Sequence, residues 1–271
     1  QLINILDDYY VYDEKLQNQL FNTRNLISSK EDLTKHYEKL RELERNLTLF
    51  HADILKKIFQ KYKDPIDIIG FHGQTIFHNA NKKISKQLGD GKLLSQIIRK
   101  RVIYDFRQAD IKNNGQGAPL APIFHYVLSK IIHQKYKIKY PMGFLNIGGI
   151  ANVTKILNTK DDINNNLFAL DIGPGNCLID NWVRNNSNKK YDDNGGVGKL
   201  GKNNELIFNQ AIENFQIKKY SNSLDIKDFD ISFARGLSFE DGCATITNFS
   251  AYLIAQGLEY ISENNSINFF V

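Results

Sequence analysis

The stretch 168–176 runs from apolar residues into Asp171 and then two closely spaced glycines, Gly173 and Gly175. These are the residues that most directly suggest chemistry. The residues that follow, 177–183, have an apolar pattern that predicts a helix. A strand that passes through a glycine turn into a helix directs backbone N–H groups and the positive end of the helix dipole at one spot, which favours an anion there. Because Asp171 would lie beside that spot, the pattern indicates phosphoryl transfer, with the carboxylate accepting a proton from an attacking hydroxyl.

Asp171 also has a purely structural interpretation, because an aspartate beside glycine commonly hydrogen-bonds its own backbone in a turn. Gly148, Gly149, Gly173 and Gly175 could likewise supply positive φ angles for turns. That role is compatible with phosphate binding. Spacing alone therefore leaves both interpretations of Asp171 open.

Three more polar clusters each follow a short apolar stretch, at residues 72–75, 105–107 and 146–149. One glycine motif is weak evidence for a site. Several polar clusters at strand ends in one chain make a shared cleft the better interpretation.

The elements that would position these clusters alternate between helix and strand. Over residues 29–62 apolar side chains recur every three or four residues, which predicts an amphipathic helix with Ser29 and Asp32 as a capping pair and Pro65 beyond its end. The other predicted elements are strands over 66–71, 102–104 and 168–172, two strands joined at a glycine turn within 144–154, and helices over 122–134, 177–183 and 238–262.

This alternation predicts an α/β fold with ligands at the carboxyl ends of the strands. The polar link 134–141 is taken as a boundary between an N-terminal domain, 1–140, and a C-terminal domain, 141–271. Residues 185–204 are rich in Asn, Asp, Lys and Gly and predict an exposed, mobile loop with a lid role. Ser238 and Asp241 resemble a capping box for the last helix.

Composition narrows the class of protein. The chain has 271 residues, 42% of them hydrophobic, and its net charge of +5 comes from scattered lysines, so we expect no nucleic-acid partner. Cys177 and Cys243 are the only cysteines, which favours buried thiols in a reducing compartment and gives no metal-binding pattern. Without a long apolar run or a basic leader, a cytoplasmic protein with no membrane partner is expected.

The motifs in this order resemble the anhydro-N-acetylmuramic acid kinase family, sugar kinases of the actin, hexokinase and heat-shock-chaperone ATPase superfamily. Together they are far more specific than any single glycine pattern. The resemblance covers roughly residues 37–271 and rests on His72-Gly73-Gln74-Thr75 with His78, Gln87-Leu88-Gly89, Asp105-Phe106-Arg107 with Asp110, residues 115–120, residues 146–152, residues 171–176 with Asp180 and Trp182, and residues 234–242.

The resemblance implies a two-domain actin-like, ribonuclease-H-like fold, in which mixed sheets are flanked by helices and ATP and sugar bind between the domains. The family opens the 1,6-anhydro bond of anhydro-N-acetylmuramic acid with water and phosphorylates O6, giving N-acetylmuramic acid 6-phosphate for peptidoglycan recycling. Mg²⁺ would accompany ATP. A homodimer is compatible with the resemblance.

Individual site residues follow from the same resemblance. Asp171 matches the catalytic aspartate that activates the water. The remaining residues assigned in this half of the chain are Asn146, Gly148, Gly149, Asn152 and Gly173 for the nucleotide phosphates, and Gly175 and Asn176 for the sugar side of the cleft.

Roles in the first half are inferred from side-chain chemistry. Gln74 and Thr75 suit sugar hydroxyls or the N-acetyl group, and Arg107 suits bidentate binding of the lactyl carboxylate. Asp105 would orient Arg107. The structural alternative is an ion pair between Asp105 and Arg107 across a loop.

Four aromatic residues are left outside the predicted site. His72 and His78 are open between a functional role and satisfied packing, since the sequence identifies no acidic partner for either. Trp182 and Tyr126 are interpreted as core residues.

Two family segments have no counterpart, the N-terminal Gly-x-Met-Ser-Gly-Thr-Ser hairpin and a Gly-Gly-Gly adenosine motif, so the chain is expected to be a fragment truncated at both ends and inactive alone. Asn113 and Asn114 also stand where the family has small residues. Two alternatives stay open: a non-catalytic sugar- or muropeptide-binding regulator of the same fold, and an actin-like ATPase.

Overall fold

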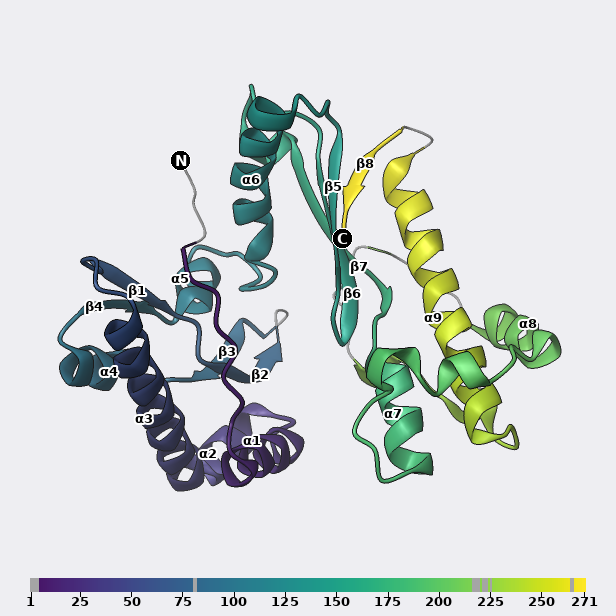
Figure 1. Ribbon diagram of the computed structural model, residues 1–271, viewed down its shortest axis with the longest axis horizontal. Helices are drawn as coiled ribbons and strands as arrows, with labels where there is room; N and C mark the ends of the chain where they lie inside the picture. Colours follow the sequence, from purple (N-terminus) through teal and green to yellow (C-terminus); the bar gives the residue numbers. More distant parts are fainter. Residues whose placement is uncertain (1–4, 80–81, 216–219, 221–223, 225, 264–265) are drawn as a thin grey trace. The chain divides into compact units, whose positions relative to one another are not determined.

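The computed structural model describes residues 5–79, 82–215, 220, 224, 226–263 and 266–271 (Figure 1). The chain forms two compact units, residues 1–120 and 121–271. They divide before α6 (Ala121–Tyr136), whereas the domain boundary predicted from the sequence lies after this helix. Both units combine helices with β-sheet, so the α/β class is confirmed.

The long helix predicted over residues 29–62 is two helices. Ser29 and Asp32 form the predicted capping box, each side chain accepting from the other residue's backbone N–H. His36 then leaves the helical conformation, with ψ of 19°, and separates the two segments. The helices of this region are α1 (Glu14–Leu26), α2 (Lys30–Lys35) and α3 (Tyr37–Lys61).

The strands of the first unit form two separate pairs. β1 (Ile68–Phe71) runs parallel to β4 (Arg101–Tyr104), and β2 (Gln74–Asn79) is antiparallel to β3 (Ile84–Leu88). Phe71 pairs with Tyr104, so the residues that follow β1 and β4 leave the sheet at the same edge. The unit is completed by α4 (Gly91–Ile98) and α5 (Phe106–Lys112).

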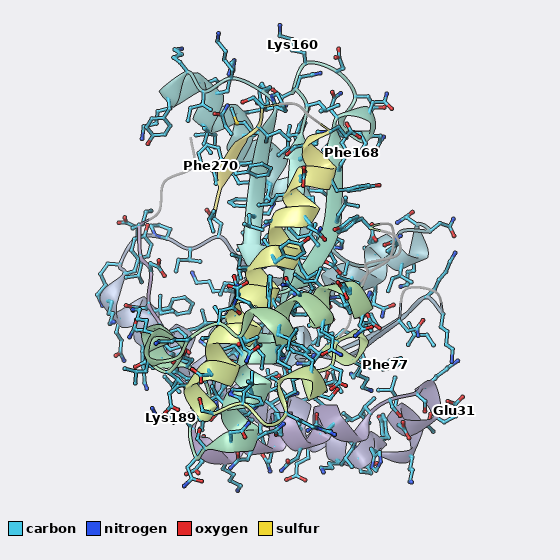
Figure 2. The ribbon with its side chains drawn as sticks, turned by 90° about the vertical axis from the view of Figure 1, so that its right-hand side faces the viewer. Glu31, Phe77, Lys160, Phe168, Lys189 and Phe270 are labelled. Atoms are coloured by element: carbon cyan, nitrogen blue, oxygen red, sulfur yellow. The ribbon has the colours of Figure 1, made fainter. Side chains whose placement is uncertain are left out.

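The second unit is built on one mixed sheet of order β7-β6-β5-β8. Three strands are antiparallel neighbours, and β8 is parallel to β5. Figure 1 shows α6 on one side of this sheet and α9 on the other, and Figure 2 shows α9 running along the strands. The elements are β5 (Met142–Ile147), β6 (Ile150–Ile156), β7 (Leu167–Pro174), β8 (Asn268–Phe270), α7 (Cys177–Asn186), α8 (Glu205–Asn214) and α9 (Phe239–Ser262).

Alternation along the strands gives each sheet face its own core. Phe144 and Ile156 pack in a cluster that includes Tyr126 of α6, whereas Val153 and Ile172 pack with side chains of α9. The packing of α9 against β7 is close, because a Cβ on Gly257 of α9 would lie 2.4 Å from Ile172 Cβ of β7. Glycine at this position therefore lets α9 approach β7.

Residues around the start of α9 fix the segment that was predicted to be a mobile lid. Most of residues 185–204 are exposed, as predicted, but Val197 is buried and the Asp192 carboxylate accepts from the N–H groups of Val197 (2.7 Å) and Gly198 (3.0 Å). The predicted capping box of α9 forms only in part. The Ser238 hydroxyl accepts from Asp241 N–H at 3.1 Å, but the Asp241 carboxylate accepts from Lys202 N–H at 2.8 Å. The structure gives no support for a lid.

Side chains predicted to be structural lie in the core. Tyr126 and Trp182 are buried, and the Trp182 indole donates to the Phe239 carbonyl at 2.8 Å. Cys177 and Cys243 are buried thiols outside any disulfide, as predicted. Among the described residues we find no helix with the length and apolar character needed to cross a bilayer.

Candidate functional site

Three polar side chains lie side by side across the sheet of the second unit. Asn146 of β5 pairs with Asn152 of β6, and Asn152 pairs with Asp171 of β7. Residues directly opposite in antiparallel strands place their side chains on the same face. The sequence predictions assigned these three residues to the site separately, and the strand register brings them into one row.

Asp171 is held by a residue far away in the sequence. Its Oδ2 accepts a hydrogen bond from Leu224 N–H at 2.9 Å. Burial raises the pKa of Asp171, and the hydrogen bond from Leu224 partly offsets the rise. The hydrogen bond expected of a turn-forming aspartate, to its own local backbone, is replaced by this long-range contact.

The glycine turns of the second unit bind each other. The Asn176 N–H donates to Gly148 O at 2.7 Å, and the Gly175 and Cys177 N–H groups donate to Gly149 O at 3.0 and 3.3 Å. These donors at the start of α7 are therefore satisfied by the β5–β6 turn. The predicted use of this helix start as an anion cradle is wrong for these three N–H groups.

The glycines of these turns are not needed for positive φ, because Gly148, Gly149, Gly173 and Gly175 all lie outside that region. Gly175 is required by close approach instead, since a Cβ there would lie 2.0 Å from Gly148 O. A Cβ on Gly173 would meet Leu253 of α9 at 3.3 Å. By contrast, a Cβ on Gly149 would meet no atom within 4 Å, so that turn lies open.

In the first unit a β-bulge gathers polar side chains on one face of the β2–β3 hairpin. Thr75 pairs with Gln87 and His78 pairs with Ser85, while the register shifts around Ile76. The extra residue places Thr75 and His78 on the same face although they are three residues apart. Gln74 pairs with Leu88 and belongs to the opposite face of the hairpin.

Arg107 is positioned by a backbone carbonyl and not by Asp105. Its Nη1 donates to Gly117 O at 2.9 Å, and the Gly117 N–H donates in turn to the Asp110 carboxylate at 2.6 Å. Among the described residues the ion pairs include neither Asp105 nor Arg107. Both the orienting role and the ion pair predicted for Asp105 are therefore wrong.

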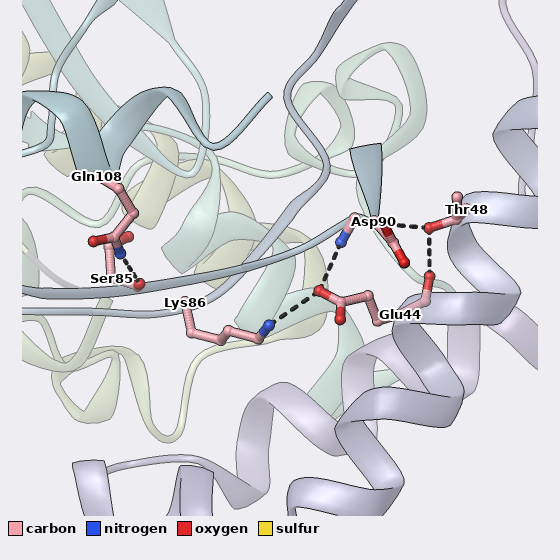
Figure 3. Close-up of polar contacts among 7 residues, drawn as sticks. Glu44, Thr48, Ser85, Lys86, Asp90 and Gln108 are labelled. Carbon is pink, nitrogen blue, oxygen red and sulfur yellow. Dashed lines mark hydrogen bonds and ion pairs between the residues drawn. The ribbon is translucent and has the colours of Figure 1, made fainter. Parts of the chain in front are cut away.

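Asp105 instead lies at a cavity of about 260 Å³ within the first unit. It precedes α5 in the left-handed region, with φ of 58°. Figure 3 shows polar contacts beside this cavity, including the Lys86 to Glu44 ion pair of 3.0 Å. The lining also includes His72, Ser85, Gln87, Asp90, Tyr104 and Gln108.

Sequence reasoning assigned no role to several residues that shape these sites. Gln87 donates from Nε2 to His72 O at 2.9 Å, and Asp110 holds the loop that carries Gly117. The bulge breaks the period-two pattern between Thr75 and His78, so alternation could not show their common face. Leu224 gave no sequence signal, because it contributes only a backbone N–H.

Fold and site define an α/β protein in which a half-buried carboxylate and two carboxamides lie beside paired glycine turns at one end of a mixed sheet. A family comparison makes this specific: the chain belongs to the anhydro-N-acetylmuramic acid kinase family, whose model matches residues 1–260.

Individual relatives agree with this assignment. An anhydro-N-acetylmuramic acid kinase from Pelagibacter ubique is 51% identical over 258 residues, covering 94% of this chain and 66% of the relative. Enzymes of the same name from Methylobacterium nodulans and Zymomonas mobilis are 37% and 36% identical, covering 83% and 84% of this chain and 59% and 61% of the relatives. The chain thus spans about three fifths to two thirds of the length of these relatives.

Proposed function

We propose that this protein is an ATP-dependent kinase that opens the 1,6-anhydro ring of anhydro-N-acetylmuramic acid with water and phosphorylates O6. The product would be N-acetylmuramic acid 6-phosphate, for peptidoglycan recycling. Membership of the family supports this activity. The observation that carries it is the half-buried Asp171 in a polar row beside two glycine turns.

Asp171 acts as the general base in this proposal. It takes a proton from the water whose oxygen bonds to C1 of the sugar as the C1–O6 bond breaks. O6 becomes the acceptor of the phosphoryl group that ATP supplies. A raised pKa makes the Asp171 carboxylate a stronger base near neutral pH, and the Leu224 N–H holds it in place.

The open β5–β6 turn suits the phosphate side of the site. Gly149 has open space where a side chain would lie, so a ligand can approach its backbone closely. Asn146 and Asn152 offer carboxamide donors on the Asp171 face of the sheet. Gly148 completes this turn, whereas Gly173 contributes by allowing close packing against α9.

Mg²⁺ would accompany the nucleotide and neutralise charge on its phosphates. Asp171 and its two carboxamide neighbours are oxygen-bearing groups of the kind that this cation accepts. The described residues contain no group of three or more His, Cys, Asp or Glu side chains that would hold a metal. In this proposal the cation enters with the bound nucleotide.

In the first unit the sugar side is assigned to Thr75 and Arg107, with Asp105 at the cavity and Gln74 on the opposite face of the hairpin. Gly175 and Asn176 of the second unit keep their predicted role on the sugar side. Arg107 is half-buried and anchored through Nη1, which leaves its other edge for a carboxylate. Asp105 at the cavity offers an acceptor for sugar hydroxyls. We further propose the two-domain actin-like arrangement, a cytoplasmic location and a homodimer for this protein.

The test is turnover by the full-length gene product. ADP release should require anhydro-N-acetylmuramic acid, and mass spectrometry should find the 6-phosphate of the opened sugar. Sugar binding without product would favour the regulator, and ADP release independent of sugar would favour the ATPase. Either outcome would refute the proposed kinase.

A further inference from the structure

Buried polar atoms without a partner concentrate in one part of the first unit. Nine such side-chain atoms occur in the described chain. Six of them belong to the polar face of the β2–β3 hairpin and to the adjoining α5, namely Thr75 Oγ1, both ring nitrogens of His78, Ser85 Oγ, Gln87 Oε1 and Arg107 Nε. A buried polar group without a partner is costly, so their clustering points to a polar ligand.

His78 and Arg107 are joined through the Gly117 loop. Arg107 Nη1 donates to Gly117 O at 2.9 Å. A Cβ on Gly117 would lie 3.3 Å from His78 Cε1, so the imidazole packs against the same residue. Gly117 has φ of +74°, and its N–H donates to Asp110, which fixes the loop that both side chains contact.

Three of the unpartnered groups match a carboxylate because they can donate to it, whereas Gln87 Oε1 is an acceptor. Arg107 Nε, an imidazole N–H of His78 and the Thr75 hydroxyl are all donors. The positive charge of Arg107 makes the surroundings favourable for an anion. Burial and the nearby Arg107 lower the pKa of His78, so it offers a neutral N–H at neutral pH.

Packing does not account for His78. His51, another half-buried histidine of the same unit, has Nδ1 hydrogen-bonded to Leu47 O at 2.8 Å. His78 has no such bond on either nitrogen, so of the two interpretations left open by the sequence the functional one is favoured over that of a satisfied packing histidine.

We propose that His78, together with Arg107 and Thr75, forms a subsite for the carboxylate of a sugar acid and selects substrates that carry it. This assignment rests on the proposed function, in which the lactyl ether supplies that carboxylate. His78 is then a specificity-determining residue that binds the substrate and takes no part in proton transfer to the reacting water.

The experiment compares two ligands by calorimetry on the full-length protein. Anhydro-N-acetylmuramic acid carries the lactyl carboxylate, and 1,6-anhydro-N-acetylglucosamine lacks it. We expect the first to bind at least about 10-fold more tightly, as loss of a charge-assisted hydrogen bond costs about 10- to 100-fold in affinity. His78→Leu should remove most of this difference, while His78→Gln, which keeps a donor, should retain part of it.

His51→Leu is the matched control, because it removes a half-buried histidine of the same unit and should leave the ratio of the two affinities unchanged. Equal binding of the two sugars by the wild type would overturn the subsite while leaving the kinase proposal standing. Binding of neither sugar would overturn both.

A measurement on the wild type keeps the proposal testable if His78→Leu does not fold. The imidazole ¹⁵N resonances of His78 should shift when anhydro-N-acetylmuramic acid is added and stay unchanged with the sugar that lacks the carboxylate. Identical shifts with both sugars, or none with either, would mean that His78 does not contact the carboxylate.

Discussion

Replacing Asp171 by Asn should separate catalysis from folding. Asn has nearly the size of Asp and still accepts the hydrogen bond that Leu224 N–H makes at 2.9 Å, but it cannot take up a proton. Loss of a general base typically costs about 10²- to 10⁴-fold in rate, so turnover should fall by that factor. The dissociation constant for the sugar should change by less than about threefold, because the lost interaction belongs to the transition state.

The same substitution should not destabilise the protein. Burial raises the pKa of Asp171 above its ordinary 3.8, so the folded state holds the proton more tightly than the unfolded chain. The free energy of unfolding therefore falls as the pH rises from 3.8 through the raised folded pKa. Asn removes this penalty, while its neutral hydrogen bond to Leu224 is weaker by about 1 kcal/mol.

We expect Asp171→Asn to unfold in urea at a midpoint no lower than that of the wild type at neutral pH, with the difference shrinking as the pH falls toward 3.8. Asp180→Asn is the matched control, since burial also raises the pKa of Asp180, which pairs with Arg184 at 3.9 Å. This control should keep turnover within a few-fold. Turnover of Asp171→Asn at a wild-type rate, or equal losses in both variants, would refute the role given to Asp171.

Three further predictions concern local structure. Gly175→Ala should lower the free energy of unfolding by about 1–3 kcal/mol, because its Cβ would overlap Gly148 O. Gly149→Ala should change the free energy of unfolding by less than about 0.5 kcal/mol but weaken nucleotide binding, because its Cβ enters open space. Urea titration measures the unfolding free energies, and calorimetry measures the nucleotide affinity. Burial, followed by the neighbouring Asp192 carboxylate, raises the pKa of the Cys243 thiol to about 12. The thiol should therefore resist alkylation at pH 8 until urea unfolds the chain, and rapid labelling of the native protein would contradict this. Ser29→Ala removes a helix cap and should cost about 1 kcal/mol in the urea-derived unfolding free energy, and no loss would mean that the cap does not stabilise the fold.

Local patterns in the sequence predicted local structure well. The capping pair at Ser29, the strands on either side of Gly148, and the helix of residues 121–136 all depend on residues close in the chain. The break at His36 was missed because the apolar spacing continues through it. Periodicity reports which face is buried and does not report where the backbone leaves the helix.

Long-range contacts were harder to predict. The row formed by Asn146, Asn152 and Asp171 depends on the register of three strands, and a bulge in β7 shifts that register. Arg107 was expected to pair with Asp105, two residues away, but it binds the carbonyl of Gly117. Charge attraction between sequence neighbours was outweighed by the path of the backbone, which turns Asp105 into the left-handed region.

The sequence by itself determined the α/β class, most element positions and the family, because periodicity, caps and ordered motifs are properties of neighbouring residues. Only the tertiary structure decided which partners the polar residues contact. It showed that the N–H groups at the start of α7 bind the opposite turn, that Leu224 holds Asp171, and that His78 lies without a partner beside Arg107. These contacts join segments far apart in the chain, so no local pattern could reveal them. Burial then shifts the pKa values of Asp171 and His78, and burial is itself a result of the tertiary fold.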